Sequence, residues 1–372
     1  MKFTIDPARL LEISQAASCN LGSDGGGPLS DFLFVLKDGA LTVSSCDGAT
    51  TLSFTVDVEG DREDGSLCLP AKFLTEAVKE FQDMEGPVLF TADGTHDVID
   101  WGSGRCSLPV HDTSGRPEPR SVDPGLAEAF SLDAADVLAA LRATAFAAQT
   151  TGVNDAVNAV NVRCEDDGTV TFAATDTRLL STCKVTSATA AAVQFSIPIF
   201  VAGKMVRLFR RLEGETVIAS DGKNFLVTCG GMTMASYVLP YKYPDYVSVM
   251  SRERGVNVFA VEVPVLLSCV RRVLALGREA VGFFSLSHDV TGLHVGAKVP
   301  DRKAEFSETI EAECAGGDIE VLLSALLMEE ILRNVPFRRL RLVVDRPNLP
   351  CFLEDADDGV RMTMMLMPVP GK

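Results

Sequence analysis

Short alternating strands that run directly into amphipathic helices recur along the chain. Three segments open in this way, and their aligned phenylalanines Phe3, Phe130 and Phe259 stand 127 and 129 residues apart. In each segment a period of two in the apolar positions gives way to a period near 3.6, which predicts a strand followed by a helix. A spacing this regular indicates a structural repeat along the whole chain.

A second strand–helix unit follows the first inside each repeat. Its aligned residues Leu69, Ile197 and Val321 are 128 and 124 residues apart. Alternating runs with tight turns follow each helix, as in LKDGALTVSS and CEDDGTVTFAA, and these predict β-hairpins. Each repeat is therefore expected to read β-α-β-β-β twice.

The repeats predict an α+β protein of three similar domains, 1–124, 125–252 and 253–372. The first join, residues 116–125, is rich in proline and charge, as a linker should be. Antiparallel strands would form sheets whose inner faces pack on the helices.

Charge narrows the possible partners without excluding nucleic acid. The 34 Lys and Arg against 51 Asp and Glu give a formal net charge of −17, which argues against a chain that grips DNA or an anionic membrane with its whole surface. The six predicted helix segments nevertheless sum to +3, with +4 on 199–212 alone, leaving −20 for the strands, turns and tails. These segments are 6–18, 70–81, 133–149, 199–212, 262–278 and 324–335. Positive charge is therefore concentrated on helices.

The cellular location of the protein and the redox state of its cysteines are predicted from features that the sequence lacks. We find no apolar run long enough to span a membrane and no secretory leader at Met1. The ten cysteines are scattered without a Cys-x-x-Cys pair, which is typical of reduced thiols. We expect a cytoplasmic protein with no membrane partner.

Catalytic and metal-binding patterns are missing as well. None of the four histidines stands at ligand spacing from another or from a cysteine, and there is no Gly-x-Ser-x-Gly elbow. The glycine-rich residues 20–28 follow a helix and lack the phosphate-loop register. Turn chemistry accounts for the acidic runs at 165–168 and 354–359. We predict no catalytic residue, no metal and no cofactor.

Five segments in this order and spacing resemble a known family. MKFTID, LCLPAKFLTEAV, AATDTRL, YPDY and the near-terminal LMP together resemble the β subunit of bacterial DNA polymerase III, the β sliding clamp, over essentially the whole chain. The resemblance implies a homodimeric ring of six domains, with helices lining a channel around duplex DNA and sheets outside. It also implies a non-catalytic subunit of a DNA polymerase holoenzyme that confers processivity. The replicative polymerase, the clamp loader and repair polymerases would dock through short peptides.

The resemblance also assigns residues of this chain to three surfaces. The walls of a hydrophobic peptide groove would be Val157, Thr175, Arg178, Leu179, Pro244, Val249, Met365, Leu366, Met367, Pro368 and Val369. The residues that face DNA phosphates would be Lys72, Lys79, Arg142, Lys204, Arg207, Arg210, Arg211, Arg271, Arg272, Arg278 and Arg333. The subunit interface would join Cys106 and Leu108, on an edge strand, to Val273 and Leu274, at a helix end.

Other readings of these residues stay open. The basic residues could be ordinary solvated helix faces, and groove residues such as Val157 and Val249 could be core. The turn at Asp176, Thr177 and Arg178 is one residue shorter than the family's, Pro370 alters the tail, and loops 20–28 and 149–156 lack the family's usual basic groups. These departures favour one alternative function, a clamp-fold scaffold that binds peptides but loads poorly on DNA. An uncharacterised acidic enzyme is a third hypothesis.

Overall fold

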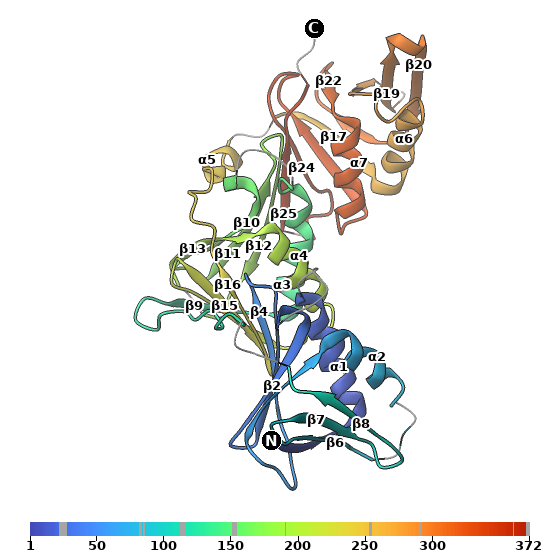
Figure 1. The fold of residues 1–372 in the computed structure, drawn as a ribbon. Coiled ribbons are helices and arrows are strands. Elements are labelled where there is room, and N and C mark those ends of the chain that lie inside the picture. The colour runs from blue at the N-terminus through green and yellow to red at the C-terminus, as the bar shows by residue number, and fades with distance from the viewer. Residues whose placement is uncertain are drawn as a thin grey trace. The chain divides into compact units, whose positions relative to one another are not determined.

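Six β-α-β-β-β units follow one another along the chain (Figure 1). The structure, a computed structural model, describes residues 1–21, 28–81, 84, 86–111, 116–150, 155–189, 191–252, 255–289, 292–359 and 361–369. Two units make each repeat, as the sequence pattern predicted. The domain boundaries at 124/125 and 252/253 stay a prediction.

Each repeat has its own set of strands and helices. The first contains β1 (Lys2–Ile5), α1 (Pro7–Ala17), β2 (Asp31–Lys37), β3 (Ala40–Cys46), β4 (Thr51–Asp57), β5 (Gly65–Pro70), α2 (Ala71–Lys79), β6 (Val88–Ala92), β7 (His96–Asp100) and β8 (Arg105–Pro109). The second contains β9 (Glu128–Asp133), α3 (Ala134–Thr144), β10 (Ala159–Cys164), β11 (Thr169–Thr175), β12 (Leu179–Thr186), β13 (Val193–Pro198), α4 (Ile199–Leu208), β14 (Glu215–Ser220), β15 (Asn224–Cys229) and β16 (Met232–Tyr237). The third contains β17 (Asn257–Glu262), α6 (Val263–Ala275), β18 (Phe284–Asp289), β19 (Gly292–Val299), β20 (Ala304–Ile310), β21 (Glu313–Ala315), β22 (Glu320–Leu323), α7 (Ala325–Asn334), β23 (Arg339–Val344), β24 (Cys351–Asp355) and β25 (Met362–Leu366).

A short helix between the second and third repeats was not predicted. It is α5 (Tyr246–Met250), and the Asp245 side chain caps it by accepting a hydrogen bond from the Ser248 amide at 3.2 Å. An aspartate before a short run of this kind is an ordinary helix-start signal. The segment had been noted only as part of the family resemblance.

Strand pairing joins neighbouring repeats into shared sheets. One eight-stranded sheet has the order β5-β2-β3-β4-β16-β15-β14-β9, and a nine-stranded sheet has the order β13-β10-β11-β12-β25-β24-β23-β17-β21. Two four-stranded sheets, β1-β6-β7-β8 and β20-β19-β18-β22, complete the set. The joining pairs are β4 with β16 and β12 with β25, both antiparallel.

The chain divides into two compact units, and the second repeat contributes to both. Unit 1 contains Met1–Leu138, Ser187–Phe195 and Gly203–Val238, and unit 2 contains the remainder of the chain. The division passes through the second repeat because each of its two edges belongs to a sheet shared with a different neighbour.

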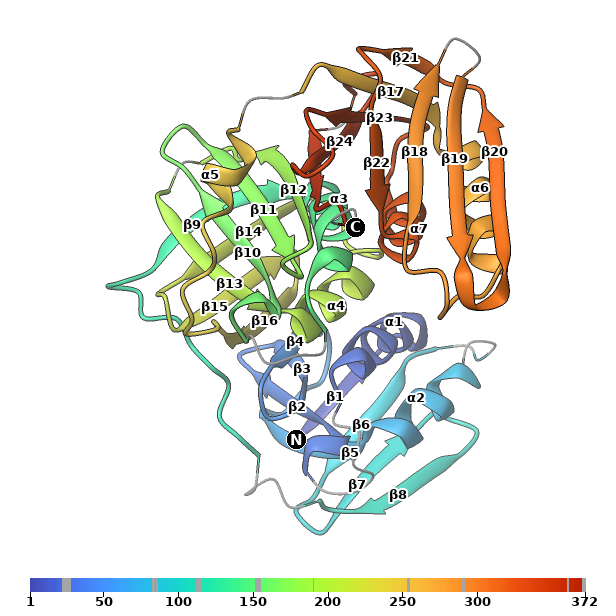
Figure 2. The same cartoon turned by 90° about the horizontal axis from the view of Figure 1, so that it is seen from above.

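The apolar markers that revealed the repeat are core residues. Phe3, Phe130 and Phe259 are each at most 1% exposed, on the first strand of each repeat. The Phe3 ring stacks on that of Phe90 with centroids 4.9 Å apart. In Figure 2, α1 lies beside α2 and α6 beside α7, and both pairs are in contact. Among the described residues, no helix has the length and apolar character needed to cross a bilayer.

Candidate functional site

The predicted groove residues all lie in unit 2 and divide into buried and accessible groups. Leu179 pairs with Leu366 across β12 and β25, and the Met367 amide donates to the Arg178 carbonyl at 2.8 Å. The buried members are Val157, Thr175, Leu179, Met365, Leu366 and Pro368. The exposed or half-exposed members are Arg178, Pro244, Val249, Met367 and Val369. Val157, Leu179 and Leu366 are therefore core residues, since none of them is more than 1% exposed.

The shortened turn between β11 and β12 closes by local hydrogen bonds. The Asp176 carboxylate accepts from the Arg178 amide at 2.8 Å and from the Leu179 amide at 2.6 Å. Thr177 adopts φ 80°, a left-handed conformation that is unfavourable for a β-branched residue. The turn is thus held by Asp176 despite its missing residue. Pro370, the other departure noted from the sequence, lies outside the described residues, as do 22–27 and 151–154 of the two loops.

An apolar cluster beneath α5 brings two of the predicted groove residues together. Met365 and Val249 pack with Tyr243 and Tyr246, whose rings meet edge to face with centroids 6.1 Å apart. Both tyrosines belong to the YPDY segment of the family resemblance, but neither was assigned to the groove from the sequence. Their i, i+3 spacing around a proline and a helix-capping aspartate was the available signal.

Ten of the eleven predicted DNA-facing residues are exposed. On α2, α3 and α7 the exposed basic residues Lys72, Lys79, Arg142 and Arg333 point away from the core. Arg207 lies in the last turn of α4, while Arg210 and Arg211 follow its end at Leu208. Cations at a helix C-terminus are favourable because carbonyl dipoles converge there.

Lys204 is the exception and corrects the prediction. It is 8% exposed, and its ammonium forms an ion pair with Asp47 and donates to the Asn20 amide oxygen at 2.7 Å. Burial alone would raise the pKa of Asp47, but the Lys204 ammonium and the Thr50 and Ala49 amides hold that pKa below its usual value. Lys204 is used to join elements within unit 1 and is not presented to solvent.

Three further arginines are exposed but engaged. Arg272 makes a bidentate pair with Glu308 of β20, with Nε 2.9 Å from the carboxylate. Arg271 and Arg278 both reach Glu329 of α7, at 3.5 and 2.6 Å. Burial would raise the pKa of Glu329, but Arg278 and Arg271 hold that pKa below its usual range. These ion pairs compete with any phosphate contact by the same arginines.

The predicted interface residues differ in accessibility. Cys106 and Leu108 are half-buried on β8, which forms one end of its four-stranded sheet. Val273 and Leu274 of α6 are at most 5% exposed, because they pack inside the third repeat. They therefore cannot present a contact surface in this chain, and β20, the edge strand that α6 packs against, is the accessible candidate.

In the part of the chain that the structure describes, no group of three or more His, Cys, Asp or Glu side chains is arranged to hold a metal ion. Burial raises the pKa of the Cys269 and Cys351 thiols to about 12, so both are protonated at neutral pH.

Comparison with known proteins agrees with the fold. Residues 1–118 match the family model of the DNA polymerase III beta subunit, N-terminal domain. The beta sliding clamp of Vibrio cholerae is 22% identical over 99% of this chain and 100% of its own. That of Vibrio harveyi is 30% identical over 29% of this chain and 74% of its own. The crystal structure of a Pseudomonas aeruginosa sliding clamp bound to griselimycin matches with a TM-score of 0.88 and 21% identity over 100% of both chains.

The repeated fold and its basic helices thus define a class, an α+β protein of six β-α-β-β-β units with the sliding-clamp architecture. The family model and the relatives assign the chain to the same family within that class. The chain belongs to the DNA polymerase III β-subunit family, the β sliding clamps.

Proposed function

We propose that this chain is a DNA polymerase processivity factor, a homodimeric ring that encircles duplex DNA and slides on it without reading sequence. The observation that carries the proposal is the exposed basic residues on the helices of a full-length clamp fold, in a chain of net charge −17. Loose contacts to phosphate suit a protein that must slide. An acidic exterior would discourage DNA from binding elsewhere.

Within this proposal the ring holds three clamp domains per subunit, 1–124, 125–252 and 253–372, and catalyses nothing itself. Edge strands pairing between subunits would continue the outer sheets, with β8 of one subunit beside β20 of the other. The ring would act in the cytoplasm, tethering the replicative polymerase and receiving the clamp loader and repair polymerases.

Partners would dock in the peptide groove. Arg178, Pro244 and Val249 give it an accessible rim, and Met367 adds a flexible thioether that adapts to different apolar anchors. A related clamp binds griselimycin, which supports a ligand-accepting surface on this fold.

Loading onto circular DNA tests the ring directly. The protein, incubated with its cognate clamp loader, ATP and nicked circular DNA, should stay on the circle through gel filtration and be lost after the circle is linearised. The triple variant Arg207→Glu, Arg210→Glu, Arg211→Glu should load more slowly or dissociate sooner, because three phosphate attractions become repulsions.

Reversal of lysines on the sheets provides the matched control. Lys37→Glu on β2 and Lys223→Glu between β14 and β15 should leave loading unchanged, since both are exposed away from the helices. Equal retention on circular and linear DNA would rule out a closed ring around DNA, whatever the behaviour of the variants.

Peptide binding in the groove is better tested by point substitutions than by deletion of residues 365–372. Met365 and Leu366 belong to β25, which lies inside the nine-stranded sheet, so that deletion would unfold unit 2. The pair Arg178→Ala and Met367→Ala changes two exposed residues and leaves the buried strand residues in place. A fluorescent peptide copying the clamp-binding segment of the cognate polymerase should bind this variant at least about tenfold more weakly. Unchanged affinity would remove the groove assignment.

One observation favours the second candidate, a clamp-fold scaffold that binds peptides without loading on DNA. Lys204 is buried, and Arg271, Arg272 and Arg278 are held by carboxylates, so fewer cations are available to phosphate than the sequence suggests. Peptide binding without retention on circular DNA would establish the scaffold instead.

A further inference from the structure

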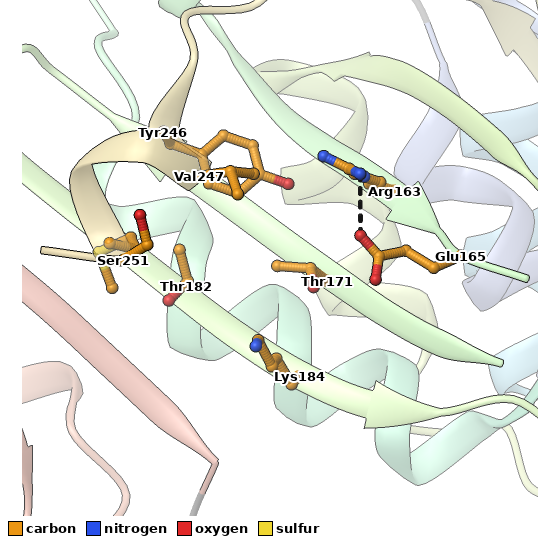
Figure 3. Close-up of a pocket in the computed structure, with 9 residues that line it drawn as sticks. Arg163, Glu165, Thr171, Thr182, Lys184, Tyr246, Val247 and Ser251 are labelled. Carbon is orange, nitrogen blue, oxygen red and sulfur yellow. Dashed lines mark ion pairs between the residues drawn. The ribbon is translucent and has the colours of Figure 1, made fainter. Parts of the chain in front are cut away.

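A polar pocket lies on the nine-stranded sheet beside α5 (Figure 3). Its volume is about 180 Å³, and no residue assigned above to DNA, groove or interface lines it. Water occupies about 30 Å³ in the liquid, so the pocket has room for a side-chain carboxylate together with a few water molecules.

Three residues form a row across the floor of this pocket. Arg163, Thr171 and Lys184 are register partners on the adjacent strands β10, β11 and β12. Directly opposed residues in antiparallel strands stand about 5 Å apart, so two cations flank one hydroxyl. The row faces away from α3, because Ser181, which donates to the Ala143 carbonyl, points to the opposite side of β12.

Neither Arg163 nor Lys184 is fully neutralised by an ion pair within the protein. Arg163 pairs with Glu165 at 2.9 Å, and the Glu165 side chain is 43% exposed, so it can turn into solvent. Lys184 makes no ion pair with any described residue, and its side chain is exposed to solvent. With Glu165 in place the pocket has a formal charge of +1, on a chain whose total is −17.

Tyr246 supplies an unused donor at the wall. It is 5% exposed, and its hydroxyl has no hydrogen-bond partner among the described residues. Figure 3 shows this hydroxyl directed toward the Arg163 side chain. Burial raises the pKa of Tyr246 to about 12, so the group is protonated at neutral pH and can donate. A buried polar atom without a partner is costly unless a ligand satisfies it.

Continuity with the proposed groove indicates the source of the ligand. The Tyr246 ring belongs to the same apolar cluster as Met365 and Val249. Val247, at the pocket rim, is 43% exposed and adds apolar surface beside the charges. A peptide whose apolar residues contact Val249 would thus pass near the pocket along α5.

We infer that this pocket is a second docking site for partner proteins, which receives the carboxylate of an Asp or Glu next to the apolar anchors of the partner's peptide. The inference rests on the proposed function, since it assumes that peptides bind the groove. Arg163 would receive the carboxylate as Glu165 turns away, while Lys184 and the Tyr246 hydroxyl would complete its hydrogen bonds.

The test uses two synthetic peptides and the full-length protein. Both copy the clamp-binding segment of the cognate polymerase; one carries Asp or Glu at the positions flanking the apolar anchors, and the other carries Asn or Gln there. The acidic peptide should bind the unmodified protein about fivefold more tightly by fluorescence anisotropy. In the double variant Arg163→Gln, Lys184→Gln that ratio should fall to about one, while the affinity of the amide peptide stays unchanged.

Two further variants test whether the preference for the acidic peptide comes from this pocket or from the overall charge of the protein. Tyr246→Phe keeps the ring in its cluster and should reduce the ratio in part. Lys37→Gln, on β2 of unit 1, should leave the ratio unchanged, because it removes the same charge elsewhere.

The results that would contradict the acidic docking site can be told apart from those that would contradict the groove. If neither peptide binds the unmodified protein, the groove and this inference fall together. If both bind with equal affinity, or if the ratio survives in the double variant, only this inference is overturned. If inorganic phosphate raises the melting temperature of the unmodified protein but not of the double variant, while the peptides bind equally, the pocket is a phosphate site and the peptide assignment is wrong.

Discussion

A single lysine shows how burial changes the meaning of a charge. Lys204 stands in the most basic predicted helix, but its ammonium is enclosed with Asp47 and Asn20. Both charged side chains of this pair are less than a fifth exposed, at 10% and 17%. Breaking such a pair leaves the other charge buried and uncompensated, which costs about 3–5 kcal/mol.

Replacing Lys204 by methionine should therefore destabilise the protein by about 3 kcal/mol at pH 7, measured by urea unfolding. The pKa of Asp47 is lowered in the folded state, so its stabilising contribution is present above the unfolded pKa and is lost as pH falls through the folded one. The difference between unmodified protein and variant should hence shrink below about pH 4. Lys223→Met, an exposed control in the same unit, should change stability by less than about 0.5 kcal/mol. A similar loss in both variants would contradict this role of Lys204.

At the scale of elements, the edge strands β8 and β20 matter most. Each ends its four-stranded sheet among the described strands, and exposure alternates along both. Strand edges of this kind offer free amides and carbonyls to another chain. Helix α6, in which Val273 and Leu274 are buried, packs against β20, so the strands themselves are the expected contact.

Cys106→Glu should weaken the homodimer by about tenfold or more, because it places a charge on the half-buried face of β8. Sedimentation velocity over a range of concentrations measures this. Ser107→Glu adds the same charge on the opposite, exposed face of the strand and should weaken the dimer less. Dimers of equal strength in both variants would remove β8 from the interface.

At the scale of the whole molecule, acidic residues regulate how much positive charge is available. Glu329 is 6% exposed and holds Arg271 and Arg278, while Glu308 holds Arg272. Part of the acidic excess behind the net charge of −17 therefore neutralises arginines that the proposed function places opposite DNA phosphates.

Glu329→Gln should release two arginines and lengthen the residence of the loaded protein on circular DNA. The dependence of log affinity on log salt should steepen by up to about 2, one unit for each new phosphate contact. Glu330→Gln, the exposed neighbour on α7, removes the same charge without freeing Arg271 or Arg278. Identical salt dependence in the two variants would show that these arginines do not reach DNA.

The sequence by itself determined the repeat and the secondary structure. Phe3, Phe130 and Phe259 are core residues on equivalent strands, as their spacing predicted, because periodicity records which face of an element is buried. The predicted ends of the six helices lie within five residues of the observed ends, but α5 was missed because five residues are too few for a periodic signal. The family resemblance was likewise available from the order of short motifs.

Tertiary structure alone decided what each charged or apolar side chain does. Lys204 and Arg207 stand three residues apart on one helix, yet one is buried against Asp47 and the other is exposed. Arg163, Thr171 and Lys184 stand 8 and 13 residues apart along the chain, and the register of three adjacent strands places them in one row. The reason is physical: periodicity depends on neighbours along the chain, whereas ion pairing and pocket formation depend on partners that folding brings from elsewhere.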